Sequence, residues 1–463
     1  MHDLKDKRVL VIGHDASARA AVRLAVSKGA RVSVVPSGPE AVSNRDIEAL
    51  ENLGAETLKL GAATKADFDV AVLSQQIPRT SEVVYPLIEK NVPVISDLEL
   101  AYQHFLCLGV AITGTNGKTT TAEFLEEMVN RCGKKTLKAG GSDTPVCDIV
   151  EQTRELDFAT LEVNSFQLES ITNFRPSVAV VLNLKPDHMD RYERMSNYAR
   201  TVAKVFQNHQ PFDWTVIQSE ALAQLVSLGV EIPSKVITFS ANNRRADIYL
   251  DRTLLISQIP DWDGPLLDMD SCRLKGPHNA ENVMAALAVG RILKLPLEEM
   301  VEAVRAHVPG PHRFETVAEA NGVTFINDSK AMNMDAVQKA LLAAPAGRGG
   351  EPNVFLIAGG KDKGLEFHDL GPLLAQRVKG AFLIGEMREK LRAAWSLFAP
   401  CTIVDSMSEA VRNAGENAQP GDVVLLSPGC SSFDMFESYQ QRGDEFREAV
   451  KNWISAEKGA VHA

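Results

Sequence analysis

The sequence of 463 residues lacks paired cysteines, an excess of positive charge and any long apolar run. Its six cysteines are scattered, with no C-x-x-C pair and no zinc-site spacing, so in a chain this long we expect reduced, buried thiols. The net charge of −11 argues against a nucleic-acid binder, because clustered Lys and Arg hold a phosphate backbone. No apolar run reaches the roughly 18 residues of a membrane helix, and the charged N-terminus does not read as a signal peptide. We therefore expect a soluble, cytoplasmic protein without membrane insertion or nucleic-acid binding, and we also expect a monomer.

Short Val/Ile/Leu runs, each followed by a helical pattern, recur along the chain. Continuous apolar strands that alternate with helices predict an α/β fold with parallel sheets covered on both faces. A chain of this length divides into two or three domains, and we place them at 1–107, 108–309 and 310–463. The predicted strands are Arg8–Ile12, Val70–Leu73, Val110–Thr113, Val178–Leu182, Val354–Ala358, Ala381–Ile384 and Val423–Leu426.

The first block opens with a strand, a turn, a helix and a second strand. Its turn, Gly13–Ala18, lacks the G-x-G-x-x-G pattern, and Pro36 follows the second strand where an acidic residue would bind a ribose. We therefore expect a Rossmann-like fold without a complete NAD site.

Residues 114–120 read G-T-N-G-K-T-T and lie between a predicted strand and a predicted helix of about 12 residues that Gly133 ends. Glycines let backbone N–H groups turn toward phosphate oxygens, and the helix start adds its positive dipole end. Lys118 would contact the β- and γ-phosphates, and the Thr119 hydroxyl would reach Mg²⁺. Ile112 stands where the general phosphate-loop pattern has its first glycine, so this loop is a shorter variant. The predicted ATP-binding residues of the loop are Gly114, Thr115, Asn116, Gly117, Lys118, Thr119 and Thr120.

Further motifs follow this loop in order, and together they carry a resemblance that covers nearly the whole chain. They are L-E-V-N-S-F-Q-L-E at 161–169, N-L-K-P-D-H-M-D-R-Y at 183–192, G-P-H-N-A-E-N at 276–282, P-H-R-F-E at 311–315, N-D-S-K-A at 327–331, G-G-K-D-K-G at 359–364, S-P-G-C-S-S-F-D-M-F at 427–436 and Q-R-G-D-E-F at 441–446. With these motifs the chain resembles the Mur ligase family, and within it the glutamate-adding members.

The resemblance implies a Rossmann-like N-terminal domain for the UDP-linked substrate, a central ATPase-like domain and a C-terminal Rossmann-like domain that binds glutamate. It implies ATP-dependent addition of D-glutamate to UDP-N-acetylmuramoyl-L-alanine through an acyl phosphate, a step of peptidoglycan precursor synthesis. ATP and a pair of Mg²⁺ ions are the implied cofactors. The same reaction with L-glutamate stays open, because the choice of enantiomer depends on pocket shape.

The resemblance also implies roles for single residues. Glu162 and His188 fit metal ligands beside Thr119, because carboxylate and imidazole suit a metal or its water. Asn279 and Asn282 match ATP-binding positions, although residues one helical turn apart could instead cap a helix. The catalytic set is Lys118, His188 and Lys330; the other ATP-binding positions are Arg313 and Asp328; the glutamate-binding positions are Lys363, Ser432 and Tyr439.

Some positions depart from the family pattern. Family members generally carry a carbamylated, metal-bridging lysine where this chain has Val202. Lys204 is two residues on, about 200° around a helix, and should face elsewhere. We therefore favour a second Mg²⁺ site without a carbamate. Met332, Ser142 and Ser74–Gln76 also differ from the usual residues, which leaves the UDP contacts and the glutamate enantiomer open.

Two other functions compete with this one. A folylpolyglutamate-synthase-like ligase would favour a G-T-N-G-K-G-S loop and lack the pattern at 427–436. A non-catalytic nucleotide-binding homologue is supported by Val202 but opposed by Lys118, Glu162 and His188, which are all present.

Overall fold

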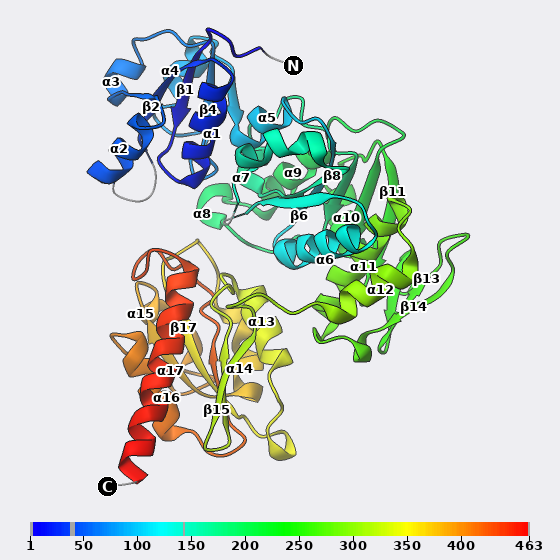
Figure 1. Cartoon of the computed structure of the whole chain (residues 1–463). Coiled ribbons are helices and arrows are strands. Elements are labelled where there is room, and N and C mark those ends of the chain that lie inside the picture. The colour runs from blue at the N-terminus through cyan, green and yellow to red at the C-terminus, as the bar shows by residue number, and fades with distance from the viewer. Residues whose placement is uncertain (1–2, 38–41, 142–143, 462–463) are drawn as a thin grey trace. The chain divides into compact units, whose positions relative to one another are not determined.

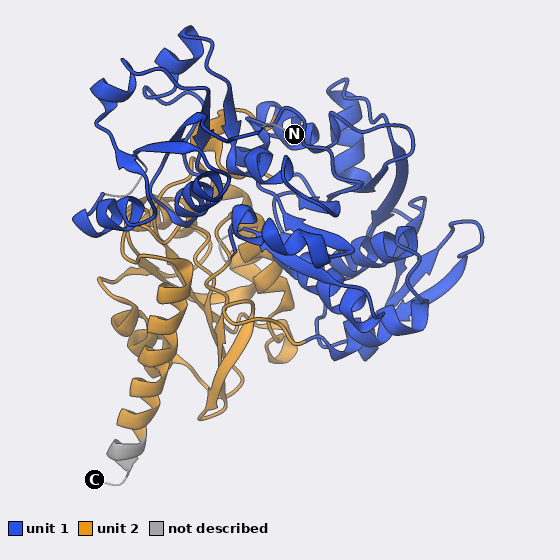
Figure 2. Ribbon diagram, turned by 45° about the horizontal axis from the view of Figure 1, so that its top comes forward, with its two compact units in different colours: residues 1–184, 196–307 blue, residues 185–195, 308–463 orange. Residues whose placement is uncertain are grey.

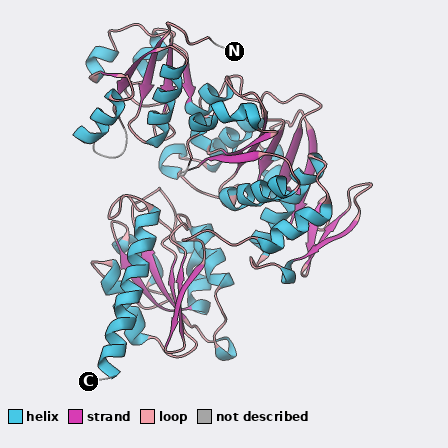
Figure 3. Ribbon diagram, viewed as in Figure 1, coloured by secondary structure: helices cyan, strands magenta, loops and turns pink. Residues whose placement is uncertain are grey.

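The computed structural model describes residues 3–37, 42–141 and 144–461 (Figure 1). The chain forms two compact units, residues 1–184 with 196–307 and residues 185–195 with 308–463 (Figure 2). Unit 1 contains a five-stranded and a nine-stranded sheet, and unit 2 contains a six-stranded sheet. Helices flank the sheets, as Figure 3 shows, and most strand pairs are parallel. The predicted α/β fold class is therefore confirmed.

The first sheet of unit 1 has the strand order β3-β2-β1-β4-β5 and is parallel throughout. The predicted strand Arg8–Ile12 is its centre, and residues 9–12 are fully buried, as a strand covered on both faces requires. Its elements are β1 (Arg8–Ile12), α1 (Ala16–Ser27), β2 (Arg31–Val35), α2 (Asn44–Glu51), β3 (Glu56–Thr57), α3 (Leu60–Ala63), β4 (Val70–Leu73), α4 (Tyr85–Glu89), β5 (Val94–Ser96) and α5 (Asp97–Tyr102).

The second sheet of unit 1 has the order β14-β13-β12-β11-β10-β9-β6-β8-β7, parallel from β7 to β12 and antiparallel beyond. Helix α11 is buried over residues 280–290, and all of these except Glu281 and Asn282 are apolar or glycine, as expected for a helix inside a core. The strands are β6 (Leu108–Thr113), β7 (Thr136–Gly140), β8 (Phe158–Glu162), β9 (Val178–Val181), β10 (Trp214–Gln218), β11 (Lys235–Ser240), β12 (Ile248–Asp251), β13 (Leu254–Ser257) and β14 (Gly264–Asp268). The helices are α6 (Lys118–Arg131), α7 (Ser165–Leu168), α9 (Met195–Ala203), α10 (Ser219–Ser227), α11 (Pro277–Ile292) and α12 (Leu297–Ala306).

The sheet of unit 2 has the order β15-β16-β20-β17-β18-β19, with only β15 antiparallel to its neighbour. Separate apolar clusters cover its two faces, one with α13 to α15 and one with α16 and α17. The strands are β15 (Glu315–Ala320), β16 (Val323–Asn327), β17 (Val354–Gly359), β18 (Val378–Ile384), β19 (Cys401–Ile403) and β20 (Val423–Leu426). The helices are α8 (Met189–Tyr192), α13 (Met334–Ala343), α14 (Gly371–Arg377), α15 (Arg388–Trp395), α16 (Met407–Asn417) and α17 (Tyr439–Val461).

The seven strands predicted from apolar runs all exist, and three have the predicted bounds. The helix predicted after the phosphate loop is α6, which has 14 residues and is followed by Gly133 at a φ of 70°. Across the described ranges, the helices are all too short or too polar to cross a bilayer.

Candidate functional site

The predicted phosphate loop connects β6 to α6 in unit 1 (Figure 1). Gly114 and Gly117 have φ values of 124° and 91°, which side chains other than glycine rarely adopt. A Cβ on Gly114 would lie 2.9 Å from the Asn183 carbonyl oxygen. Gly117 is the N-cap of α6 and brings no side-chain oxygen to the helix start, where phosphate oxygens would accept N–H groups.

Side chains from other elements hold the loop in this shape. The Asn183 amide accepts the Asn116 N–H at 2.9 Å and donates to the Asn116 carbonyl at 2.9 Å. The Thr115 hydroxyl lies 3.0 Å from that of Tyr198 on α9. The Lys118 ammonium donates to the carbonyls of Gly114 and Thr115, at 2.7 and 2.9 Å. Lys118 therefore lies over the loop, where a cation can meet phosphate oxygens.

Two of the predicted metal ligands meet at the mouth of this loop. The Thr119 hydroxyl donates to a Glu162 carboxylate oxygen at 2.7 Å, and Glu162 ends β8 with 8% of its surface exposed. Gly141 packs on this carboxylate, since a Cβ there would lie 2.8 Å from its carbon. Mg²⁺ takes few protein oxygens and completes its shell with water and phosphate. No group of three His, Cys, Asp or Glu suited to a metal occurs in the part of the chain described here, so this pair alone would be a partial site.

The two asparagines of the 276–282 motif lie within α11. Gly276 is the N-cap of that helix, so the capping interpretation of Asn279 and Asn282 is wrong. The Asn279 amide donates to the Lys275 carbonyl at 2.8 Å. Asn282 is buried and faces the phosphate loop, because a Cβ on Gly117 would lie 2.1 Å from its Oδ1 atom. Asn282 is therefore in place to meet a ligand of the loop.

In unit 2, the Asp187 carboxylate lies beside two predicted site residues, Lys363 and His188. It accepts from the buried Lys363 ammonium at 2.5 Å, and its other oxygen lies 3.7 Å from His188 Nε2. The Asn333 amide donates to the same carboxylate at 3.4 Å. A buried ion pair is costly to assemble, so this one fixes the geometry of Lys363 more than it stabilises the fold.

The N-D-S-K-A motif follows β16 and forms a second group in unit 2. The Lys330 ammonium lies 3.8 Å from the centre of the Tyr439 ring, in a cation–π contact. Lys330, a predicted catalytic residue, is therefore in contact with Tyr439, a predicted glutamate-binding residue. Asp328 accepts the Phe314 N–H at 3.1 Å and the Ser427 hydroxyl at 3.3 Å. Burial raises the pKa of Asp328 to about 7, against these hydrogen bonds and the nearby Arg313.

The motifs of unit 2 contain three of the non-glycine residues with positive φ. His188, His312 and Phe314 have φ values of 54°, 64° and 49°. Such conformations cost about 1–3 kcal/mol each and are retained where function needs them. His312 and Phe314 lie on either side of Arg313, a predicted ATP-binding residue.

Known proteins match this chain over almost its whole length. A family model described as Mur ligase middle domain matches residues 112–290, and one described as Mur ligase, glutamate ligase domain, matches residues 312–430. A UDP-N-acetylmuramoylalanine–D-glutamate ligase of Pelotomaculum thermopropionicum is 37% identical over 99% of this chain and 100% of its own. One of Acidobacterium capsulatum is 36% identical over 97% of both chains.

The chain belongs to the Mur ligase family. The resemblance stated from the motifs is thereby confirmed. A solved UDP-N-acetylmuramate-alanine ligase from Thermotoga maritima has the same fold, with a TM-score of 0.61 and 15% identity, over 98% of this chain and 100% of that one.

This Mur ligase contains a buried arginine to which the sequence analysis assigned no role. Arg442 of α17 is fully buried and donates to the Ser329 hydroxyl and carbonyl and to the Cys430 carbonyl, at 3.0, 2.8 and 3.1 Å. It thus ties the loop after β16, which carries Lys330, to the loop after β20, which carries the buried Ser432. Burial lowers the pKa of Arg442 to about 10, and it stays charged at neutral pH. The position of Arg442 in the motif at 441–446 was the sign in the sequence that this residue matters.

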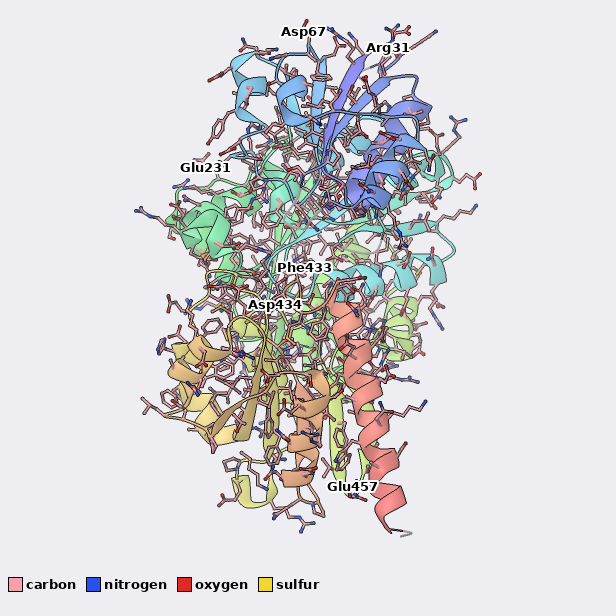
Figure 4. The ribbon with its side chains drawn as sticks, turned by 90° about the vertical axis from the view of Figure 1, so that its left-hand side faces the viewer. Arg31, Asp67, Glu231, Phe433, Asp434 and Glu457 are labelled. Carbon is pink, nitrogen blue, oxygen red and sulfur yellow. The ribbon has the colours of Figure 1, made fainter. Side chains whose placement is uncertain are left out.

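The loop after β20 lies at the end of unit 2 where α17 starts. Figure 4 shows Phe433 and Asp434 there, with Glu457 toward the other end of that helix. Arg442 reaches this loop from the first turns of α17, because the helix begins beside it. The carboxyl ends of parallel strands are the usual place for a ligand in such sheets.

A cleft of about 200 Å³ in the first sheet region of this Mur ligase was also missed. It lies at the carboxyl ends of β1, β2 and β4, next to the point where the strand order reverses, where ligands bind in doubly wound sheets. Arg19 of α1 supplies a cation, and His14 Nδ1 lies 3.0 Å from the Ser37 carbonyl. Ser142, another position expected to differ in substrate contacts, lies outside the described residues. The lining residues are His14, Asp15, Ala16, Arg19, Ser37, Asp46 and Gln76.

Helix α9 shows why position 202 matters in this Mur ligase. Val202 is buried one helical turn after Tyr198, on the face that meets the phosphate loop. Lys204 follows the helix and its ammonium donates to the Glu169 carbonyl at 3.0 Å. Burial, together with the nearby Arg79, lowers the pKa of Lys204. The expected difference in direction between Val202 and Lys204 agrees with this geometry.

Proposed function

We propose that this Mur ligase adds D-glutamate to UDP-N-acetylmuramoyl-L-alanine with ATP, as a step of peptidoglycan precursor synthesis. Relatives that carry the name of this ligase match the chain from end to end. In the molecule itself, the observation that carries the proposal is the phosphate loop with the Thr119 hydroxyl 2.7 Å from the Glu162 carboxylate. We also propose that the enzyme works as a cytoplasmic monomer, and that residues 1–107, 108–309 and 310–463 bind the UDP-linked substrate, ATP and glutamate respectively.

The reaction consists of two substitutions. An oxygen of the alanyl carboxylate attacks the γ-phosphorus of ATP, the bond to the β,γ-bridging oxygen breaks, and ADP leaves. The amine of D-glutamate then attacks the carbonyl carbon of the acyl phosphate, inorganic phosphate leaves, and the nitrogen loses a proton to give the amide. Several anions meet in both steps, so the protein must neutralise charge and hold the reactants in line.

Unit 1 supplies the phosphate-binding groups. The N–H groups at the start of α6 and the Lys118 ammonium would hold the β- and γ-phosphates. Thr119 and Glu162 offer the hard oxygen ligands that Mg²⁺ prefers, so the residues present fit this ion. When bound, Mg²⁺ would shield the phosphate charges during transfer. Asn279 and Asn282 remain proposed contacts of the nucleotide.

Unit 2 supplies cations and hydroxyls for the second reactant. Lys363 is held by Asp187, and its ammonium would bind a glutamate carboxylate together with Ser432. The Lys330 ammonium packs on the face of the Tyr439 ring, so the two residues can contact neighbouring groups of the ligands. Arg313 and Asp328 are proposed ATP contacts, and His188 a proposed metal contact. The N-terminal cleft with Arg19 is the proposed site of the uridine diphosphate.

Phosphate release measures this activity directly. The purified enzyme is given ATP, Mg²⁺ and UDP-N-acetylmuramoyl-L-alanine, with D-glutamate, with L-glutamate or with neither amino acid. We expect release that requires all the substrates and D-glutamate, and mass spectrometry of the product should show the added glutamate. The Lys118→Ala variant gives the background rate. Absence of turnover with either enantiomer would overturn the proposal.

Two alternatives give different results in the same assay. Met332 stands where the glutamate-adding enzymes usually have Thr, and this favours a test of L-glutamate; turnover with L-glutamate alone would assign that substrate instead. Val202 favours a non-catalytic homologue, which would bind ATP without releasing phosphate.

A further inference from the structure

Helix α5 carries two fully buried carboxylates that no step of the proposed reaction uses. Asp97 and Glu99 are 2% and 0% exposed. Helix α5 follows the last strand of the first sheet, and both side chains contact segments that belong to the second sheet of unit 1. Buried charges are retained where they are fully hydrogen-bonded, and these two are bonded in different ways.

Glu99 is bound by three backbone N–H groups and by the Gln103 amide at the end of its own helix, at 3.0 Å. Its carboxylate accepts the N–H groups of Thr172, Asn173 and Phe174, at 2.9, 3.0 and 2.9 Å. This arrangement anchors α5 on the loop that precedes β9. None of these contacts leads to the N-terminal cleft or to the phosphate loop.

Asp97 is bound by side chains of two other helices. One carboxylate oxygen accepts the Ser17 hydroxyl of α1 at 2.5 Å, and the other accepts the Gln167 amide of α7 at 3.0 Å. The Leu98 N–H donates to the same carboxylate at 2.9 Å. Three donors converge on the two oxygens of this carboxyl group, whereas an amide in its place has a single oxygen and would turn an N–H group toward one of the three donors.

The two helices that Asp97 joins lead to the two ends of the proposed substrate. Ser17 lies in the first turn of α1, between Ala16 and Arg19, which line the N-terminal cleft. Gln167 belongs to the capping box of α7, which starts three residues after Glu162 at the phosphate loop. Both donors are buried, so neither helix can shift without breaking a hydrogen bond that water cannot replace.

A second connection runs parallel to this one. The Asn164 amide, from the same capping box, donates to Gln75 at 2.8 Å, and Gln75 donates to the Gly141 carbonyl at 3.3 Å. Gln75 follows β4 beside the cleft, and Gly141 packs on Glu162. Both connections link the cleft to the Glu162 end of β8.

We propose that Asp97 is a positioning residue that sets the distance between the nucleotide cleft and the phosphate loop, so that a bound UDP-linked carboxylate reaches the γ-phosphate. The inference rests on the proposed function, because it assigns the UDP end to the cleft and the carboxylate end to the loop. A substrate held at its UDP end by a displaced α1 would present its carboxylate out of line.

Asp97→Asn and Glu99→Gln are the matched pair that tests this. Both remove one buried charge from α5, but only the first disturbs the link between α1 and α7. We expect Asp97→Asn to lower kcat/KM for the UDP-linked substrate by roughly 10²-fold, with the KM for ATP unchanged. Glu99→Gln should lower Tm while leaving the KM values as in the wild type. Ser17→Ala, which keeps the carboxylate and its other bonds, should show the same selective change if Asp97→Asn fails to fold.

A rescue variant separates positioning from general damage. In Asp97→Asn/Gln167→Glu, the new amide oxygen can still accept from the Leu98 N–H, while its NH2 group, at the position of Oδ2, can donate to the Ser17 hydroxyl oxygen and to the new carboxylate. The new carboxylate can also keep the α7 capping bond. We expect this double variant to recover most of the lost kcat/KM. Equal effects of Asp97→Asn and Glu99→Gln on KM and Tm, or a double variant worse than the single one, would overturn the inference. An inactive wild-type enzyme would instead overturn the proposed function, and this inference with it.

Discussion

The phosphate loop of unit 1 and the loops after β16 and β20 in unit 2 are held in shape by different means. In unit 1, two glycines with positive φ, a helix start and the side chain of Asn183 fix a run of seven residues. In unit 2, Arg442 reaches from α17 to the loops after β16 and β20. The first arrangement is local and mostly backbone, whereas the second is a buried cation that joins distant segments.

The difference has a consequence for mutation. A change in the phosphate loop should affect ATP binding and catalysis with little effect on folding, because the loop adds little buried apolar area. A change at Arg442 should mainly lower the stability of unit 2, because the buried oxygens that accept from its guanidinium would be left without hydrogen bonds to protein or water. Each prediction below tests one side of this contrast.

Lys118→Ala should have the largest effect, a loss of turnover of at least about 10³-fold, because Lys118 is the cation that the loop itself offers to the γ-phosphate. Phosphate release measures the loss, and urea unfolding should show that the fold survives. Lys135→Ala, an exposed lysine just after α6, is the control and should keep full activity. Turnover close to that of the control would refute the phosphate role of Lys118.

Arg442→Met should cost about 3 kcal/mol or more of the free energy of unfolding of unit 2. Trp395 and Trp453 lie in unit 2 and Trp214 and Trp262 in unit 1, so variants retaining one pair of tryptophans report on each unit separately by fluorescence. Arg412→Met, an exposed arginine of α16, is the control. An equal loss in both units, or none in unit 2, would contradict the role of Arg442 in holding the loops after β16 and β20 together.

Gly117→Ala should weaken ATP binding by roughly 10²-fold, since the new Cβ would meet Asn282 at 2.1 Å and the φ of 91° is strained. Isothermal titration with ATP measures the dissociation constant. Gly133→Ala has a similar φ of 70° with open space around it, so it controls for strain without the clash. If both variants bind ATP equally well, the contact between Gly117 and Asn282 does not shape the site.

The pH dependence of stability should differ between the units. Burial raises the pKa of Asp328 to about 7 and that of Asp97 to about 6, from 3.8. The folded state then keeps a proton that the unfolded state has released, so each contribution is largest at low pH and is lost as the pH rises through the folded pKa. Each carboxyl gives a slope of at most about 1.4 kcal/mol per pH unit.

Urea unfolding at pH values from about 4 to 7, followed by the tryptophans of each unit, measures these slopes. Asp328→Asn should flatten the slope of unit 2 and leave that of unit 1. Asp97→Asn should do the reverse. A slope of unit 2 that persists in Asp328→Asn would assign the titration to another group.

The smallest effect concerns bicarbonate. Because Lys204 donates to the Glu169 carbonyl and Val202 occupies the face toward the phosphate loop, we expect activity to be the same with and without bicarbonate. Mass spectrometry of the intact enzyme under mild conditions checks for a carbamate. A carbamate on Lys204 together with bicarbonate-dependent turnover would show that this expectation is wrong.

Much of the fold could be predicted from local patterns. Residues 9–12 and 423–426 are apolar throughout and lie in central strands, because a strand covered on both faces has no polar positions. The loop at 114–120 could be assigned because glycine, lysine and threonine stand at fixed spacings between a strand and a helix. The capping interpretation of Asn279 and Asn282 failed, because Gly276 starts the helix and spacing alone does not mark its first residue.

The sequence by itself thus determined the alternation of strands and helices, the phosphate loop and, through its ordered motifs, the family. Only the tertiary structure showed the polar partners: Ser17 and Asp97 are 80 residues apart, Ser329 and Arg442 are 113 apart, and Asp187 and Lys363 are 176 apart. Periodicity and spacing report on neighbours along the chain. The partner of a buried charge depends instead on which distant segments fold against it, and burial makes that partner energetically necessary.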